Sequence, residues 1–161
     1  MYASGNLVPL VALAILSAAT CSPSVDLTKG LQVDVLSTGW FDAGIVAGKN
    51  KLVPSISLTL KNASGQTLRT LQVNVVFHRV SDPGIEWGNG FSTAAESLAP
   101  GAVTTPVTLR SQLGYTGTDP RLEMLKNSQF VDATVDLFAK YGSTQWARLG
   151  EYPVSRQLIV R

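Results

Sequence analysis

The feature that most constrains the fold of this chain is an alternation of apolar and polar residues, which begins near Lys29 and continues towards the C-terminus. Successive side chains of a β-strand point to opposite faces, so a strand with one buried face is apolar at every second position. The pattern is clear in the stretches Leu31–Val35 and Ile56–Leu60. It predicts an all-β domain.

Further alternating stretches lie at Leu71–Phe77, Val103–Leu109, Phe130–Ala139 and Pro153–Val160. Clusters rich in Gly, Pro and Asn punctuate the chain at Asn62–Gly65, Asp82–Gly84 and Ala99–Gly101, and we expect Asp82–Gly84 to end the strand before it. Short strands separated by such turns are typical of an antiparallel sandwich. Side chains on the more apolar side of each strand should form its core, including Leu58, Leu60, Val73, Val75 and Val135.

One short helix is expected near residues 119–127. Asp119 is a suitable N-cap, Pro120 suits the first helical position, and Leu122 with Leu125 gives one apolar stripe.

The N-terminus has a different character. The first 28 residues contain no Lys or Arg and a single acidic residue, Asp26. Residues 7–19 (LVPLVALAILSAA) form an apolar to weakly polar run, shorter than the roughly 20 residues needed to cross a bilayer. Such a run is typical of the apolar region of a secretory signal peptide, and Ser17–Ala19 supplies the small residues of a cleavage site.

The single cysteine, Cys21, follows this run directly. In an exported protein it has no internal disulfide partner, so it is free, paired between chains or modified. The stretch Leu16–Cys21 resembles a bacterial lipoprotein signal, and the resemblance implies that Cys21 is lipidated, with Ser22–Ser24 as a polar tether. Ordinary cleavage near Ala19 and a retained apolar anchor helix remain alternatives. The expected organisation is a signal peptide or anchor at 1–20, a tether at 21–29 and a β-sandwich at 30–161.

Two stretches resemble a known family. Residues 58–84 (LTLKNASGQTLRTLQVNVVFHRVSDPG) and 97–109 (SLAPGAVTTPVTL) are similar to the strands and turns of immunoglobulin-like envelope modules of the FxLYD kind. The Leu-Tyr-Asp signature is absent, and Phe77-His78-Arg79 stands near its expected place. The resemblance implies an immunoglobulin-like fold and a non-enzymatic accessory or binding domain, and it carries over no functional residues.

The residue types needed for catalysis are sparse. His78 is the single histidine and lies on the polar side of its strand, while Cys21 belongs to the export signal. Asp132 and Asp136, on one face of a strand, would be about 13 to 14 Å apart, wider than the carboxylate pairs of glycosidases at about 5 to 9.5 Å. We therefore predict no catalytic residues, no metal site and no cofactor.

The formal charge of +2 comes from basic residues scattered along the chain, and it indicates no nucleic-acid partner. Large aromatic residues beside glycines offer a different hint, because such residues are enriched at recognition surfaces. We hypothesise that their loops converge at one end of the sandwich to bind a partner, although the same rings would also fill a core. The candidate partner-binding residues are Trp40, Phe41, Trp87, Phe91 and Tyr115.

The sequence thus favours a membrane-anchored module on the periplasmic side of the bacterial cell envelope that contacts another envelope protein or complex subunit. The alternative is a periplasmic protein that binds a small ligand or a glycan, which requires a concave aromatic pocket.

Overall fold

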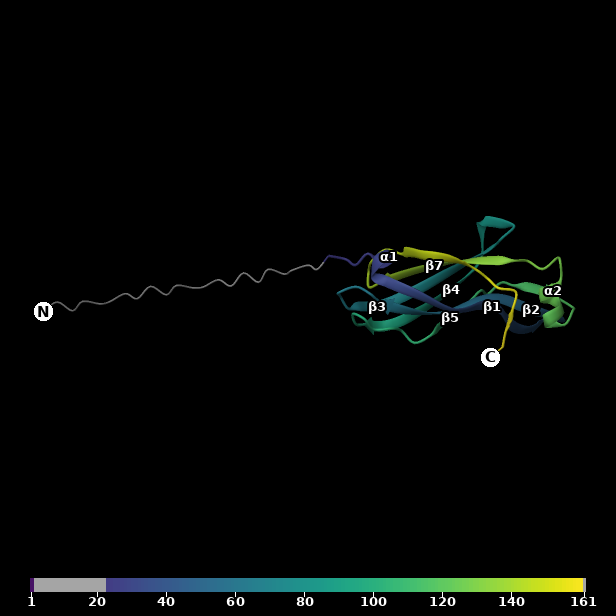
Figure 1. Cartoon of the computed structure of the whole chain (residues 1–161), viewed down its shortest axis with the longest axis horizontal. Helices are drawn as coiled ribbons and strands as arrows, with labels where there is room; N and C mark the ends of the chain where they lie inside the picture. The colour runs from purple at the N-terminus through teal and green to yellow at the C-terminus, as the bar shows by residue number, and fades with distance from the viewer. Residues whose placement is uncertain (2–22, 161) are drawn as a thin grey trace.

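The structure, a computed structural model, describes Met1 and residues 23–160 (Figure 1). The predicted leader, Cys21 and the start of the tether lie outside the described residues. Within the described part of the chain, no helix has the length and apolar character needed to cross a membrane.

The described chain is mostly β. The helices are α1 (Leu27–Gly30) and α2 (Arg121–Lys126). The strands are β1 (Leu31–Val46), β2 (Lys49–Asn62), β3 (Leu68–Arg79), β4 (Asp82–Leu98), β5 (Val107–Arg110), β6 (Tyr115–Gly117), β7 (Ala133–Tyr141), β8 (Ala147–Pro153) and β9 (Leu158–Ile159).

These strands form two sheets. The first has the order β5-β2-β1-β9, with β6 also paired to β2, and the second has the order β4-β3-β7-β8. Neighbouring strands are antiparallel except for the short parallel pair β1–β9. One hydrophobic cluster takes side chains from both sheets. The predicted all-β class, with antiparallel sheets and one short helix near 119–127, is confirmed.

The predicted core is also confirmed. Five side chains that the alternation assigned to the interior have no exposed surface: Leu58, Leu60, Val73, Val75 and Val135. Buried and less buried side chains alternate along β3 and β7. The two strands pair in continuous register from Leu71–Tyr141 to Arg79–Ala133. The register keeps one face of each strand apolar and buried, as a half-buried sheet requires.

The domain has two distinct ends (Figure 1). β1 and β3 both begin at the end that carries α1. β1 leads to the turn Ala47–Gly48 on the side of α2, and β3 leads to the turn Val80–Ser81 of a hairpin that projects from the domain (Figure 1). We call the first the α1 end. The second, comprising both turns, the segment 111–114, α2 and the connection 127–132, is called the loop end.

The sequence prediction was wrong about where β3 and β4 meet. The turn is Val80–Ser81, and Asp82–Gly84 opens β4 instead of ending a strand. β4 had not been predicted, because its glycines read as loop residues. An added Cβ at Gly90 would lie 2.9 Å from the Arg110 carbonyl oxygen. Glycine there permits close approach of β4 to the segment around β5.

The boundaries of α2 also need correction. The N-cap is Pro120, which makes no side-chain capping hydrogen bond, and the backbone carbonyl of Asp119 accepts a hydrogen bond from Asn50 Nδ2 at 2.9 Å. Leu125 is buried as expected, but its partner in the core is Met124, whereas Leu122 is exposed.

The predicted strand Pro153–Val160 is split between the two sheets. β8 ends at Pro153 in the second sheet, and β9 pairs with Trp40–Phe41 of β1 in the first. The predicted strand Val103–Leu109 likewise starts later, with β5 at Val107, and Val103 forms an isolated bridge to Lys61.

The chain is fixed to the domain before the predicted boundary at residue 30. The Val25 amide donates to the Tyr141 hydroxyl at 2.6 Å, and Asp26 caps α1 by accepting from the Thr28 amide at 3.0 Å. Leu27 is buried in the core. Part of the segment assigned to the tether therefore packs against the sandwich.

Candidate partner-binding end

The structure corrects the expectation that aromatic residues form an exposed surface. Trp40, Phe41 and Trp87 are 0 %, 7 % and 8 % exposed. Tyr115, on β6, is half-buried, and Phe91 is exposed on the outer side of β4. Trp40 and Phe41 lie within β1, which extends well past its predicted end, so they are strand residues and not loop residues. Trp40 belongs to the core, whereas Phe41 is buried outside the core cluster, with the Arg110 guanidinium carbon 3.5 Å from its ring centroid.

Three of these residues do come together, but inside the domain. The Trp40 ring lies 6.0 Å from the Trp87 ring and 4.5 Å from the Phe130 ring, measured between centroids. Tyr115 meets the other side of the cluster, 4.8 Å from Phe130 in an edge arrangement. Edge-to-face contacts of this kind add stability beyond burial alone. Phe130, which sequence reasoning did not link to the others, joins them into a rigid base beneath the loop end.

Arg156 fastens the connection between α2 and β7 to this base. Its Nε and Nη2 donate to the two Asp132 carboxylate oxygens at 2.6 and 2.8 Å. Its guanidinium also donates to the backbone carbonyls of Leu125, Asn127 and Phe130 at 3.2 to 3.4 Å. A single side chain thus satisfies carbonyl groups near the end of a helix, where intrahelical partners are missing.

The hydrogen bonds from Arg156 hold the pKa of the Asp132 carboxyl below its ordinary value. Replacing Arg156 with alanine is expected to reduce the free energy of unfolding by about 1 to 2 kcal/mol, because several charge-assisted hydrogen bonds are lost at a half-exposed site. Chemical denaturation at neutral pH measures this loss. An unchanged midpoint would show that the connection holds its place without Arg156.

The sign of the pH effect follows from the lowered pKa. Asp132 contributes stability at pH values above its ordinary pKa of 3.8, and this contribution is lost as the pH falls through the lower pKa of the folded state. The Arg156→Ala variant should therefore lose less stability than the native protein on acidification below that value.

Several aliphatic side chains are exposed at the loop end. Six aliphatic side chains there are 49 to 69 % exposed, and they belong to both hairpin turns, the segment after β5 and α2: Ile45, Val46, Val80, Ile85, Leu113 and Leu122. Single exposed aliphatic residues are common on protein surfaces. Ile85 and Leu113 lie together at one depression, and exposed apolar side chains that lie together mark interaction sites.

A depression of about 250 Å³ lies beside the β3–β4 hairpin at this end. Its lining includes Ile85, Trp87 and Leu113 together with the charged residues Arg79, Asp82 and Glu86. Arg79 covers the indole, with its guanidinium carbon 5.0 Å from the ring centroid. The depression thus combines apolar and charged lining residues.

The carboxylates considered in the sequence are bound by cations. Asp136 accepts a hydrogen bond from Arg148 Nε at 3.1 Å, and its Oδ2 lies 3.4 Å from His78 Nε2. The His78 Nδ1 is 3.0 Å from the Ile85 carbonyl oxygen, which can only accept, so this nitrogen donates. His78 therefore ties the β3–β4 hairpin to β7. Among the described residues, no group of three or more His, Cys, Asp or Glu is placed to hold a metal ion.

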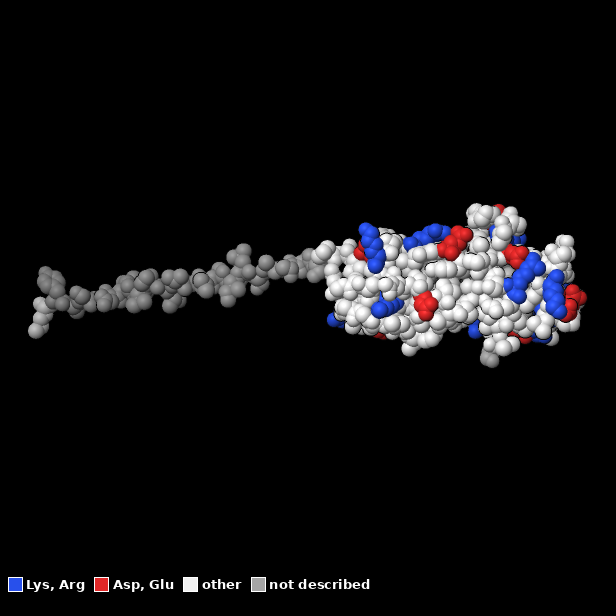
Figure 2. Space-filling view, viewed as in Figure 1, with Lys and Arg blue, Asp and Glu red and all other residues white. Residues whose placement is uncertain are grey.

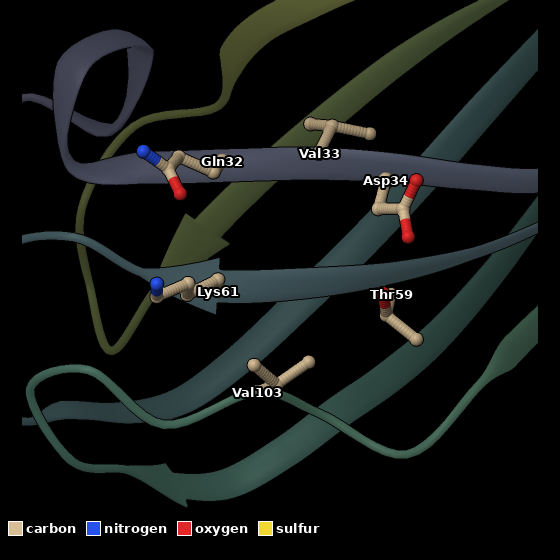
Figure 3. A pocket seen from close by; sticks show the side chains of 6 residues that line it. All are labelled: Gln32, Val33, Asp34, Thr59, Lys61 and Val103. Carbon is tan, nitrogen blue, oxygen red and sulfur yellow. The ribbon is translucent and has the colours of Figure 1, made fainter.

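A second depression, of about 270 Å³, lies on the outer face of the first sheet (Figure 3). Figure 3 shows its lining side chains on β1, β2 and the segment before β5: Gln32, Val33, Asp34, Thr59, Lys61 and Val103. No aromatic side chain lines it, and its charged members are exposed to solvent. It lacks the convergent, partly buried groups of a specific ligand site.

Comparison with known proteins gives distant structural likenesses. No family model matches the chain, and no curated protein matches its sequence. A target of the Northeast Structural Genomics Consortium is similar over 80 % of this chain and 89 % of its own, with a TM-score of 0.46 and 14 % identity. A protein from Archaeoglobus fulgidus is similar over 77 % and 96 %, with a TM-score of 0.36 and 11 % identity.

An exo-β-N-acetylglucosaminidase of family GH20 from Vibrio harveyi is similar over 82 % of this chain but 19 % of its own length, with a TM-score of 0.28 and 11 % identity. Likenesses this distant give no information on function.

Proposed function

We propose that this protein is a non-enzymatic accessory module of the bacterial cell envelope, tethered to a membrane on the periplasmic side, which binds another envelope protein through its loop end. The observation that carries the proposal is the group of exposed aliphatic side chains on the turns of that end, from Ile45 to Leu122. They lie opposite α1, where the tether joins the domain (Figure 1).

The energetics favour a partner at this end. Covering exposed apolar surface contributes about 25 cal/mol per Å², and binding costs less when the contacting groups are already fixed in place. The aromatic base of Trp40, Trp87 and Phe130 and the bonds of Arg156 supply that rigidity. Turns on a rigid scaffold are where binding residues usually concentrate.

An immunoglobulin-like arrangement is part of the proposal. Two sheets with a shared core and turns gathered at both ends support it, as does the resemblance of residues 58–84 to FxLYD modules. A non-enzymatic role is supported by the arginine partners of Asp132 and Asp136, because carboxylates held in ion pairs are poorly placed to move protons.

The tether is tested by changing Cys21. If Cys21 carries the lipid, Cys21→Ala is expected to move the protein from the membrane fraction to the soluble fraction, because stable anchoring needs more than a short apolar run. Cell fractionation measures the shift, and mass spectrometry reports whether the leader remains. A variant that stays in the membrane with its leader intact would instead indicate a retained anchor helix.

The binding role is tested by a photoreactive residue in place of Ile85, which is expected to crosslink to a second envelope protein in intact cells. The second candidate function, binding of a small ligand or glycan, is favoured by the depression beside Trp87. Arg79 already covers that ring, so little aromatic face is open to a ligand. If position 85 forms no adduct with a protein, and its photoreaction is instead suppressed by a soluble ligand, the result would favour this alternative.

A further inference from the structure

The α1 end lies within a few residues of the proposed anchor. The Pro23 carbonyl accepts a hydrogen bond from Gln66 Nε2 at 3.0 Å, and the Val25 amide donates to Tyr141. Cys21 precedes Val25 by four residues, which span roughly 14 Å when fully extended. A lipid on Cys21 would therefore keep the α1 end close to the bilayer surface.

Three exposed basic side chains lie at this end, Lys29, Lys61 and Arg69, and two of them are in no ion pair among the described residues. Lys61 and Arg69 are exposed where β2 ends and β3 begins, and no ion pair of the described residues includes them. Lys29 is 87 % exposed and lies 3.7 Å from Asp26. At the loop end, Arg121, Lys126 and Arg156 pair with Asp42, Glu123 and Asp132, while Lys49 and Lys51 are in no ion pair within the described part of the chain.

The charges of Lys61 and Arg69 are therefore available to an outside partner. Figure 2 shows basic side chains on the part of the domain where the described chain begins. The nearby carboxylates are those of Asp26, of Asp34 in the depression that Lys61 also lines, and, close to the end of β4, of Glu96. A cationic surface attracts anionic headgroups, and the attraction is about 1 kcal/mol for each Lys or Arg near the membrane.

An exposed tryptophan accompanies these charges. Trp146 is 39 % exposed, and Lys140 Nζ lies 5.0 Å from its ring centroid. Together with residues 143–145 and Ser24–Leu27, it lines a depression of about 450 Å³ beside the attachment point. Tryptophan and lysine are both suited to the interface between lipid and water, since each has an apolar body and a polar end.

We infer that the α1 end is a contact surface for anionic lipid headgroups, which holds the domain upright with the loop end facing away from the membrane. This inference rests on the proposed tether. Lys29, Lys61 and Arg69 supply the attraction, while Trp146 enters the headgroup layer. The membrane then sets the orientation in which the loop end meets its partner.

The test uses the full lipidated chain in vesicles of phosphatidylcholine, with or without phosphatidylglycerol, that carry a nitroxide on the headgroup. Flotation measures tethering, and quenching of tryptophan fluorescence measures contact. Because Trp40 and Trp87 are buried, the signal lost in a Trp146→Phe variant reports Trp146. Quenching of Trp146 is expected to be at least about twofold stronger in the anionic vesicles, given the attraction of each cation.

A matched pair of variants isolates the charges. Neutralising Lys29, Lys61 and Arg69 to glutamine should remove the excess quenching while flotation persists. The same change of charge at the loop end, with Lys49, Lys51 and Lys126 changed to glutamine, should preserve it. If the protein floats but Trp146 is quenched equally in the two kinds of vesicle, or equally in the two triple variants, the inference would be overturned while the tether would stand. Loss of flotation in the native protein would overturn the tether and the inference with it.

Discussion

Changing Trp87 to alanine is expected to lower the free energy of unfolding by about 3 to 5 kcal/mol, the usual cost of deleting a large buried aromatic side chain. Trp87 is 8 % exposed, packs against Trp40 and supports Arg79 on its outer side. Removing its ring leaves a cavity between the two sheets at the loop end. Urea denaturation followed by circular dichroism measures the loss.

Phe91 is the matched control, because it lies on the same strand and is exposed. Its ring contacts Trp146 at 6.3 Å between centroids and otherwise faces solvent. Phe91→Ala should change the free energy of unfolding by about 0.5 kcal/mol or less. A larger loss for Phe91 than for Trp87 would contradict the aromatic base described for the loop end.

The second large effect is expected at Leu60, where substitution by alanine should cost about 2 to 5 kcal/mol. Leu60 has no exposed surface and lies in the centre of the shared core. Thr59, the preceding residue on the opposite face of β2, should tolerate alanine with a loss well under about 1 kcal/mol. If Thr59→Ala is the more damaging change, β2 is placed one residue out of register.

Alternation predicted β3, β7 and the second half of β2, because these segments have one face in the core, but not residues 52–56 of β2, which are buried consecutively. The same signal failed in β1. Thr38–Phe41 are buried consecutively, since the C-terminal segment covers the outer side of the strand there. An added Cβ at Gly39 would meet Ile159 and Gln157. That cover comes from residues more than 100 positions away, which no local pattern contains.

The candidate site was predicted in part. The sequence grouped Trp40, Phe41, Trp87, Phe91 and Tyr115 at one surface. The structure joins Trp40, Trp87 and Tyr115 through Phe130 and in the core, while Phe91 contacts Trp146 instead. Aromatic residues beside glycine were assigned to loops, because glycine is common in turns. Glycine also occurs within strands that approach another segment closely, as at Gly90. The exposed aliphatic turn residues carried no sequence signal, because their exposure depends on which strands extend to the loop end.

The pairing of Arg156 with Asp132 was likewise beyond the sequence. The two residues are separated by 24 positions and lie on different connections. Ion pairs of this kind have no fixed spacing, whereas pairs on a helix such as Glu123 with Lys126 do.

Site-specific photo-crosslinking in intact cells tests the central claim most directly. A photoreactive amino acid replaces Ile85 at the loop end or, as the control, Val103 on the sheet face near the α1 end; the native side chains are 62 % and 55 % exposed. The account predicts one discrete adduct with a second envelope protein from position 85 and none from position 103. Adducts from position 103 alone, equal labelling at both positions, or no adduct from position 85 would contradict it.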